Sequence, residues 1–487
     1  MTFISLSFMI FLPLVVAAYF ICPTRWRWAL LLAASCYFYM AFVPAYILVL
    51  FALIAIDYIG ALLIERSEGR SRTMYLVLCI VGSVGLLFFF KYFDFFNGNV
   101  AALAHLLDWN YSIPALKLLW PLGLSFHTFQ SLSYVIEVYR GTYKAERHLG
   151  VYALYVMFFP QLVAGPIERP AQLIPQLKNP RSFDYSNAVE GLQMILWGFF
   201  KKVVIADNLG VMVDFIYAHS ATADGSVIAL AVAAFAVQLY ADFSAYSDIA
   251  IGSAKMLGID LVQNFRQPFF SRSVAEFWRR WHISLSSWFR DYVYTPLLWQ
   301  WRAGGRIAEF AVIMITFVLV GFWHGPAWTF IVMGAIFGTY IALGSLTKRI
   351  RDALLRPFPQ LLRSWWQVLI TYCLVAVAFV FFRAPSLGAA LDLLHTLVTR
   401  WGSGAFAFLR CSDYCSVYAI GIGRKELLAV GVAVLALFIY EYIQQVGITV
   451  PAWLDRRLVR WSAYYALILC MLLMAHFIPR TFIYFQF

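Results

Sequence analysis

The stretch from Ile307 to Leu346 reads IAEFAVIMITFVLVGFWHGPAWTFIVMGAIFGTYIALGSL. It consists of two apolar runs, 307–323 and 327–346, which are separated by His324 and a Gly-Pro pair. Each run has roughly the 17–20 residues that an α-helix needs to cross about 30 Å of hydrocarbon. Glu309 is the only charged residue in the first run. The pattern predicts two membrane-spanning helices with a histidine at the turn between them.

The rest of the chain is also rich in long apolar runs. Of its 487 residues, 62% are hydrophobic and 13% are charged, against about 25% charged residues in a typical soluble protein. Because one soluble domain of this size cannot bury so much apolar surface, a soluble fold is excluded. Further apolar runs lie at 4–20, 27–43, 46–64, 74–91, 118–138, 149–164, 188–205, 226–246, 366–382, 427–444 and 461–478. The sequence predicts an all-α, polytopic transmembrane helical bundle of about 11–13 spans, with re-entrant and amphipathic segments around a central chamber.

The net charge is +12, from 37 Lys and Arg residues against 25 Asp and Glu residues. Most of these basic residues lie in short loops between apolar runs, where an excess of Lys and Arg marks the cytoplasmic side. The strongest basic loop holds Lys348, Arg349, Arg351, Arg356 and Arg363. Counting spans predicts that the N-terminus and the loop 384–426 lie on the outer side. No nucleic-acid motif accompanies the positive charge, so nucleic acid is not an expected partner.

Two polar segments interrupt the apolar pattern. The first, from Phe158 to Leu177, reads FFPQLVAGPIERPAQLIPQL and contains four prolines. Proline removes a backbone donor, and free carbonyl groups are costly in hydrocarbon, so the segment must pack in protein or face water. An interfacial loop and a re-entrant loop at a functional site both fit.

The second segment, from Asn264 to Leu297, reads NFRQPFFSRSVAEFWRRWHISLSSWFRDYVYTPL. Ser273 and Glu276 have the spacing of a capping box, which predicts that a helix begins there. Helical spacing then places Trp278, Trp281, His282, Leu285 and Phe289 on one face, with Arg279, Arg280 and Arg290 mainly on the other. Such a helix could lie on lipid phosphates, or its arginines and His282 could face a chamber that holds an anionic cofactor. The composition fits both interpretations.

His324 is the strongest candidate for a catalytic group. Ionisable residues at membrane depth are costly and usually face the interior of a bundle. Gly321, Gly325 and Pro326 loosen the helix around His324, and a neutral imidazole can take a proton from a hydroxyl group. The alternative is a histidine that bonds a carbonyl group for packing, which is also what we expect of His127.

Four carboxylates, Asp57, Asp207, Asp242 and Asp248, fall in or near the predicted spans. They could form the proton relay of a transporter, but their contexts share no pattern, which favours hydrogen bonding between helices. The sequence has no metal-ligand spacing, and no metal is expected. Cys411 and Cys415 lie in the predicted outer loop, where a disulfide is chemically permitted but not decided by the sequence.

Four motifs together resemble the membrane-bound O-acyltransferase family, and within it the bacterial branch typified by the membrane subunit of alginate O-acetylation. They are FFPQLVAGPIERP, from Phe158; YSDIAIGSAKMLGI, from Tyr246; EFWRRWHISLSSWFRDYVYTPL, from Glu276; and GFWHGPAW, from Gly321. The order of the WRRWH and WHG elements is the most specific part of the likeness. The likeness to the family covers the chain to about residue 345, with a weaker similarity at 381–391.

The resemblance implies one domain over residues 1–487, with N-terminal spans in 1–150, the motifs in 150–346, and C-terminal spans with an outer loop in 347–487. It implies transfer of an acetyl group from acetyl-CoA, with no tightly bound cofactor, to hydroxyl groups of an extracytoplasmic polysaccharide. The expected setting is the bacterial inner membrane with its lipids, with the N-terminus in the periplasm and a periplasmic partner protein of the acetyltransferase type.

By the same resemblance, His324 matches the essential histidine of the family and His282 matches its second histidine. Arg279, Arg280 and Arg290, with Trp278 and Trp281, are then the expected residues of the CoA site. Two alternatives remain open at this point. One is D-alanyl transfer to teichoic acid from a carrier protein, and the other is a flippase or transporter for a lipid-linked sugar, which would not consume acetyl-CoA.

Overall fold

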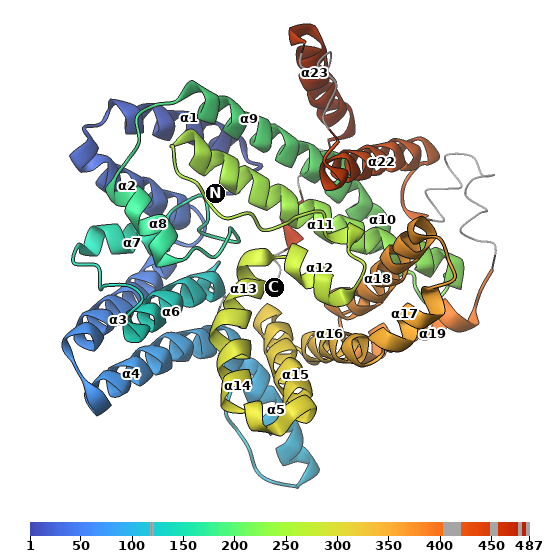
Figure 1. The fold of residues 1–487 in the computed structure, drawn as a ribbon, viewed down its shortest axis with the longest axis horizontal. Helices are drawn as coiled ribbons and strands as arrows, with labels where there is room; N and C mark the ends of the chain where they lie inside the picture. Colours follow the sequence, from blue (N-terminus) through green and yellow to red (C-terminus); the bar gives the residue numbers. More distant parts are fainter. Residues whose placement is uncertain (117, 119–120, 403–419, 449–455, 476–479, 484–487) are drawn as a thin grey trace. The chain divides into compact units, whose positions relative to one another are not determined.

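A computed structural model describes the chain except residues 117, 119–120, 403–419, 449–455, 476–479 and 484–487 (Figure 1). The described residues form helices joined by turns and irregular segments, with no strand among them. Eight helices in this part are long and apolar enough to cross a membrane: Pro44–Arg66, Gly69–Leu106, Gly225–Met256, Arg302–His324, Trp328–Leu346, Gln360–Arg383, Arg424–Val446 and Arg457–Met474. The protein is therefore an all-α, multi-pass membrane protein. Cys411 and Cys415 lie outside the described residues.

Several predicted spans differ from the helices that form. The run 149–164 was expected to span the membrane, but α7 (Leu149–Met157) ends before Pro160. The run 74–91 instead continues to Leu106 through a π-helical turn, Phe88–Tyr92. Two further apolar helices, α1 (Leu6–Ile21) and α19 (Leu387–Thr399), are shorter than a full span. Proline and local changes of helical winding, which hydropathy does not register, account for these differences.

The chain divides into two compact units. Unit 1 comprises Met1–Ile195, Ser247–Gln263 and Gly325–Ala327, and unit 2 comprises Leu196–Tyr246, Asn264–His324 and Trp328–Phe487. Two helices, α9 (Tyr185–Phe200) and α11 (Gly225–Met256), contribute residues to both units.

Unit 1 contains eight helices besides its part of α9 and α11. These are α1, α2 (Arg27–Met40), α3 (Ile47–Arg66), α4 (Gly69–Leu87), α5 (Phe93–Leu106), α6 (Leu124–Arg140), α7 and α8 (Pro170–Lys178). At its centre, buried Asp57 on α3 accepts hydrogen bonds from Ser83 on α4 (2.9 Å) and Ser131 on α6 (2.6 Å). Asp57 thus joins three helices, as expected for hydrogen bonding between helices. His127 also has the expected structural contact, because its Nδ1 bonds the Val156 carbonyl oxygen at 3.0 Å.

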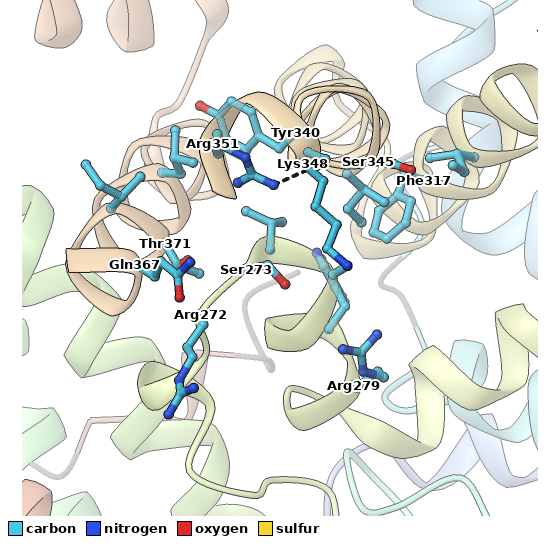
Figure 2. Close-up of a pocket in the computed structure, with 18 of the residues that line it drawn as sticks. Arg272, Ser273, Arg279, Phe317, Tyr340, Ser345, Lys348, Arg351, Gln367 and Thr371 are labelled. Atoms are coloured by element: carbon cyan, nitrogen blue, oxygen red, sulfur yellow. Dashed lines mark hydrogen bonds between the residues drawn. The ribbon is translucent and has the colours of Figure 1, made fainter. Parts of the chain in front are cut away.

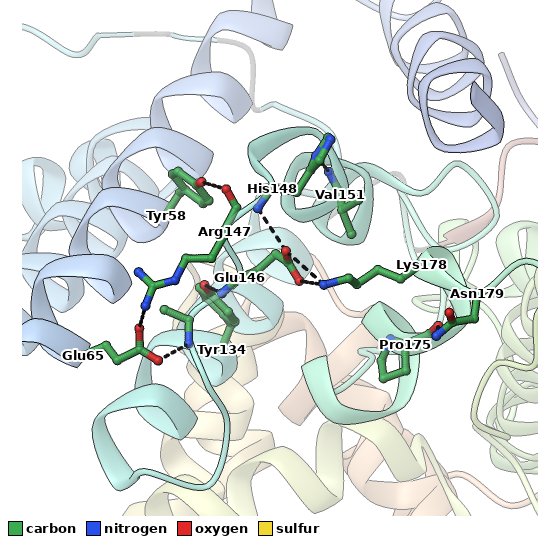
Figure 3. A network of polar contacts seen from close by, with 11 residues as sticks. Tyr58, Glu65, Tyr134, Glu146, Arg147, His148, Val151, Pro175, Lys178 and Asn179 are labelled. Atoms are coloured by element: carbon green, nitrogen blue, oxygen red, sulfur yellow. Dashed lines mark hydrogen bonds and ion pairs between the residues drawn. The ribbon is translucent and has the colours of Figure 1, made fainter. Parts of the chain in front are cut away.

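The loop between α6 and α7 is held by two carboxylates (Figure 3). Glu65, at the end of α3, forms an ion pair with Arg147 and accepts a hydrogen bond from the Ala145 amide. Buried Glu146 forms an ion pair with Lys178 of α8 at 3.1 Å and accepts from the His148 amide at 3.0 Å. These contacts fix the short turn at which α7 begins.

The proline-rich segment is packed inside unit 1. Its residues from Phe158 to Ile167 are all buried, so it is not a solvated interfacial loop. The Phe159 amide donates to Ser35, and the Tyr155 hydroxyl donates to the Glu168 carbonyl oxygen. Such contacts supply the hydrogen bonds that irregular backbone needs at membrane depth.

Glu168 is a buried carboxyl group at the end of this segment. Its Oε1 accepts a hydrogen bond from the Val262 amide at 2.7 Å, while Oε2 has no hydrogen-bond partner among the described residues. Burial raises the pKa of Glu168 to about 8, and the amide of Val262 and the charge of Arg169 oppose that shift. Glu168 therefore ties two loops together largely as a neutral acid near pH 7.

Unit 2 contains the segments that carry both candidate histidines. Its elements are the π-helical segment η4 (Lys201–Ala206), α10 (Asp207–Ala218), α12 (Val274–Arg280), α13 (Ile283–Phe289), η6 (Arg290–Tyr294), α14 (Thr295–Gln300), α15 (Gly305–His324), α16 (Trp328–Leu346), α17 (Lys348–Leu355), α18 (Gln360–Arg383), α19, α22 (Arg424–Val446) and α23 (Arg457–Met474). In Figure 1, α15 and α16 lie side by side as a hairpin, with α18 beyond α16.

Two glycines set the contact between α15 and α16. A Cβ atom built at Gly321 would lie 2.2 Å from the Phe330 carbonyl oxygen, and one built at Gly334 would lie 2.2 Å from the Phe317 carbonyl oxygen. The two backbones therefore touch directly at this crossing, which small residues permit in membrane helices. His324 is the last residue of α15, one turn beyond Gly321.

The expected single amphipathic helix after Ser273 is wrong in its length. The Ser273 cap forms, since its hydroxyl accepts from the Glu276 amide at 3.2 Å, but the Glu276 side chain accepts from the Arg272 amide and not from that of Ser273. However, α12 ends at Arg280, and His282 takes a left-handed conformation with φ of 44° before α13 begins. Buried Asn264 stabilises this break, because its side-chain oxygen accepts from both the amide and the hydroxyl of Ser284.

Candidate functional site

The structure brings both predicted histidines to the same tryptophan. The ring of Trp323 lies 5.1 Å from that of His324 and 5.8 Å from that of His282, measured between centroids. Their residues are buried, with exposed fractions of 6% for His324 and 0% for His282. One ring comes from the end of α15 and the other from the break between α12 and α13, so the fold pairs two motifs that are far apart in the sequence.

Aromatic side chains enclose the two imidazoles. The His324 ring packs on Phe330 of α16 and Phe382 of α18, at 6.3 and 5.4 Å. The His282 ring meets Phe243 edge-on at 4.7 Å. Burial lowers the pKa of His282 well below its ordinary value, and the interaction with His324 lowers it further. His282 is therefore neutral near pH 7, with one ring nitrogen able to donate and the other able to accept.

A large pocket in unit 2, which we call the basic pocket, has a volume of about 1540 Å³. Its basic side chains are Arg272, Arg279, Arg290, Lys348, Arg351 and Arg363, and its acidic ones are Glu309 and Asp352. In Figure 2 the Lys348 side chain extends from its helix toward Arg279. The remaining wall is mostly apolar and comes from α12, α13 and the helices from α15 to α18. A pocket with excess positive charge and an apolar interior suits a ligand with phosphates at one end and an uncharged arm.

Neither His282 nor His324 is among the residues that line the basic pocket, but residues close to each of them in the chain are. Ile283 lines it directly after His282 in the chain, and Val320 lines it one helical turn before His324. Trp278, on α12, lines the same side. A ligand whose charged end lies at Lys348 would therefore extend along α15 toward the imidazole pair.

The structure divides the five predicted cofactor residues between two places. Arg279, Arg290 and Trp278 line the basic pocket. Arg280 instead forms an ion pair with Glu276 at 2.7 Å and donates to Gln445 at 2.6 Å. Trp281 packs in an aromatic cluster, with its ring between 5.1 and 5.3 Å from those of Phe265, Phe277 and Phe379. The break at His282 removes Arg290 from the helix that carries Arg279. Arg279 and Arg280 still share α12, where successive side chains point about 100° apart.

Four basic residues of the pocket were not among the predicted site residues: Arg272, Lys348, Arg351 and Arg363. The last three were interpreted only as a cytoplasmic loop. Lys348 and Arg351 lie three residues apart on α17, a spacing that places both side chains on one face. This spacing was the signal in the sequence from which a shared binding role of Lys348 and Arg351 could have been predicted. No group of His, Cys, Asp and Glu side chains that could hold a metal ion occurs in the described part of the chain.

A multi-pass helical protein with paired buried imidazoles beside a basic pocket is typical of a membrane-embedded transferase. The comparisons with known proteins make this specific. The sequence model of the membrane-bound O-acyltransferase family (MBOAT) matches residues 148–360, which contain both histidines. The probable alginate O-acetylase AlgI of Azotobacter vinelandii is 38% identical over 78% of this chain and 74% of its own. The peptidoglycan O-acetyltransferase of Helicobacter pylori is 33% identical over 80% of this chain and 78% of its own length.

A third relative, the teichoic acid D-alanyltransferase of Streptococcus thermophilus, is 30% identical over 54% of this chain and 68% of its own. The chain belongs to the membrane-bound O-acyltransferase family, and it is an O-acyltransferase. The transporter alternative therefore loses its basis, since the family and the relatives indicate an O-acyltransferase, while Asp57 and Asp242 bond side chains of other helices.

Proposed function

We propose that this O-acyltransferase moves an acetyl group from acetyl-CoA to hydroxyl groups of a polysaccharide across the membrane. The basic pocket is the observation that carries the proposal, because it joins a cluster of six basic side chains to the neighbours of the histidine pair. Guanidinium groups bind phosphates bidentately, which suits the phosphates of CoA, and the apolar wall along α15 suits its uncharged arm.

The relatives support acetyl as the acyl group. Two relatives that cover more than three quarters of this chain are named as O-acetyl-transferring proteins of a polysaccharide or of peptidoglycan. The D-alanyltransferase of Streptococcus thermophilus matches only 54% of the chain. We therefore infer an acetyl donor and a glycan acceptor, with D-alanyl transfer as the alternative that the assay below separates.

The proposed mechanism is general-base catalysis by His324. A neutral imidazole nitrogen of His324 removes the proton of the acceptor hydroxyl while the oxygen attacks the thioester carbonyl carbon. The carbon–sulfur bond then breaks, the new ester leaves, and the imidazolium returns its proton to the thiolate, which gives free CoA. His282, neutral because it is buried, donates a hydrogen bond to the carbonyl oxygen as negative charge develops there.

The proposal also assigns the donor and the N-terminus to opposite sides of the membrane. Lys348, Arg351 and Arg363 border the basic pocket, and basic loops lie in the cytoplasm, so acetyl-CoA is bound from that side. We place the protein in the bacterial inner membrane with its N-terminus in the periplasm. A periplasmic acetyltransferase-type protein is the expected partner that handles the polysaccharide.

Purified protein in lipid nanodiscs tests the proposal. Acetyl-CoA should be consumed, measured as free thiol, and His324→Ala should lower the rate about 10²–10⁴-fold because it removes the general base. His219→Ala is the matched control, since His219 is an exposed residue at the C-terminal end of α10 whose Nδ1 bonds the carbonyl oxygen of Phe215 in that helix. Size-exclusion profiles should be the same for all three proteins. Wild-type rates in His324→Ala, or turnover only with a D-alanyl carrier protein, would contradict the proposal.

A further inference from the structure

Unit 2 contains a second, smaller cavity with a polar wall. Its volume is about 260 Å³, and its charged or amide side chains include Lys202, Asp207, Asp214, Gln238, Asp242 and Arg383. We call it the polar cavity. It is smaller than the roughly 300–1,000 Å³ of typical small-molecule sites, so it can hold about one ring-sized group rather than a whole cofactor.

The polar cavity and the basic pocket lie at opposite ends of α18. The basic pocket is lined by α18 residues from Leu362 to Leu374, whereas the polar cavity is lined by Arg383, the last residue of that helix. Phe382 packs on His324 at 5.4 Å and on Phe235, a wall residue of the polar cavity, at 6.4 Å. By these contacts, two aromatic rings, Phe382 and the wall residue Phe235, connect His324 with the polar cavity.

The ionised groups of the polar cavity neutralise one another. Lys202 forms ion pairs with Asp242 at 2.7 Å and with Asp207 at 2.8 Å. Asp214 pairs with Arg383 and, at 2.8 Å, with Arg480. Three basic and three acidic side chains thus balance among the wall residues, unlike the basic pocket with its excess of cations. A cavity of this kind offers polar contacts without attracting a net charge.

One wall residue has an unused hydrogen-bond acceptor. Gln238, on α11, is 6% exposed, and its Oε1 has no hydrogen-bond partner among the described residues. A buried carbonyl oxygen without a donor is unfavourable, so the group that fills the cavity should supply one. A hydroxyl group is such a donor, and unlike an ammonium group it brings no charge into a balanced wall.

We propose that the polar cavity binds a neutral sugar unit of the acceptor and presents its hydroxyl group to His324. This inference rests on the proposed acetyl transfer and adds the chemical class of the acceptor and its place. The donor then approaches along α15 from one end of α18, and the sugar approaches from the other. In this proposal the rings of Phe235, in the wall of the polar cavity, and of Phe382, which contacts His324, turn aside when the hydroxyl reaches the imidazole.

Two substitutions test the cavity without touching the histidines. Gln238→Leu keeps the side-chain size but removes the acceptor oxygen. In Gly210→Ala, the new Cβ would lie 2.5 Å from Arg480 Nη1 and 2.8 Å from Gln238 Nε2, both ends of flexible side chains, and would displace them from their present positions. Gln360→Leu, at an exposed position on α18, is the matched control.

The assay measures acetyl transfer in nanodiscs to a neutral glucose oligomer and to a uronate oligomer, together with acetyl-CoA hydrolysis without acceptor. We expect the neutral oligomer to be preferred, and Gln238→Leu to raise its KM about tenfold. Gly210→Ala should raise it as well, while hydrolysis and the KM for acetyl-CoA stay at wild-type values in both variants and in Gln360→Leu.

An unchanged acceptor KM in Gln238→Leu, equal shifts in the KM of donor and acceptor, a preference for the uronate, or transfer only to a serine-containing peptide would each overturn the inference. If the proposed function itself is wrong, the wild-type protein will not consume acetyl-CoA at all. The assay therefore distinguishes that failure from a failure of the inference about the polar cavity.

Discussion

The basic pocket and the polar cavity are both rich in charge, but they use it in different ways. Lys348 and Arg351 are exposed at the border of the basic pocket, where their charge is available to a ligand. Lys202, at 1% exposure, holds two carboxylates together in the wall of the polar cavity. Exposed cations can recruit an anion at little cost to the fold, whereas buried ion pairs shape a cavity and mainly support the structure around it.

The largest expected effect comes from removing a buried cation. Lys202→Met leaves Asp207 and Asp242 without their common partner, and a broken buried pair typically costs about 3–5 kcal/mol. We expect a clear fall in the apparent melting temperature, measured by tryptophan fluorescence in detergent. Lys348→Met, the same change in the basic pocket, should alter the free energy of unfolding by less than about 0.5 kcal/mol. Equal losses in the two variants would remove the distinction between the regions.

Glu168 extends the comparison to a buried carboxyl group that bonds a backbone amide instead of a lysine. Burial raises its pKa to about 8, against about 4.3 in an unfolded chain. Between these values the folded protein holds a proton that the unfolded chain has lost. The free energy of unfolding therefore falls as the pH rises through this window, by up to about 1.4 kcal/mol per pH unit.

The test of this pH dependence is Glu168→Gln, which keeps the acceptor for the Val262 amide but cannot ionise. Its melting temperature should fall less than that of the wild type between pH 6 and pH 9. Exposed Glu190→Gln serves as the control. Parallel curves for the Glu168→Gln variant and the wild type would show that Glu168 does not carry the pH dependence.

The smallest effects should come from removing exposed charges at the border of the basic pocket. Lys348→Gln combined with Arg351→Gln should raise the KM for acetyl-CoA about 3–10-fold, because each exposed contact contributes about 0.2–1 kcal/mol. The effect should shrink with added salt and with acetyl-dephospho-CoA, which lacks one phosphate.

Arg349→Gln combined with Arg356→Gln is the matched control, since these neighbours are not among the described residues that line the pocket. If the control pair raises the KM as much as Lys348 and Arg351 do, general surface charge rather than the pocket binds the donor.

The sequence was sufficient for the fold class and for both candidate histidines. Runs of apolar residues long enough to span a bilayer are a strong signal, and the WRRWH and WHG elements single out His282 and His324. What the sequence could not supply is that both rings lie on Trp323, because that contact depends on how α15 packs in unit 2.

The sequence failed where local conformation departs from regular helix. Arg279 and Arg280 are neighbours, yet one lines the basic pocket and the other bonds Gln445. Both lie on α12, where successive side chains point about 100° apart, so the two arginines face different neighbours. The left-handed backbone at His282 ends the expected helix, and no pattern in the sequence indicates it because it is uncommon for a residue other than glycine. Lys202 was missed for a different reason: its partner Asp242 lies on another helix, so only the fold shows that this lysine is buried.

The crossing of α15 and α16 at Gly321 and Gly334 has a consequence for how this enzyme can change. Since backbone meets backbone there, no side chain lies between the helices that could repack to absorb a larger residue. An added methyl group at either glycine must displace α15 as a whole. The imidazole of His324, which lies one turn beyond Gly321, moves with it. The walls of the basic pocket and of the polar cavity can therefore vary, while the position of the His324 imidazole tolerates almost no variation.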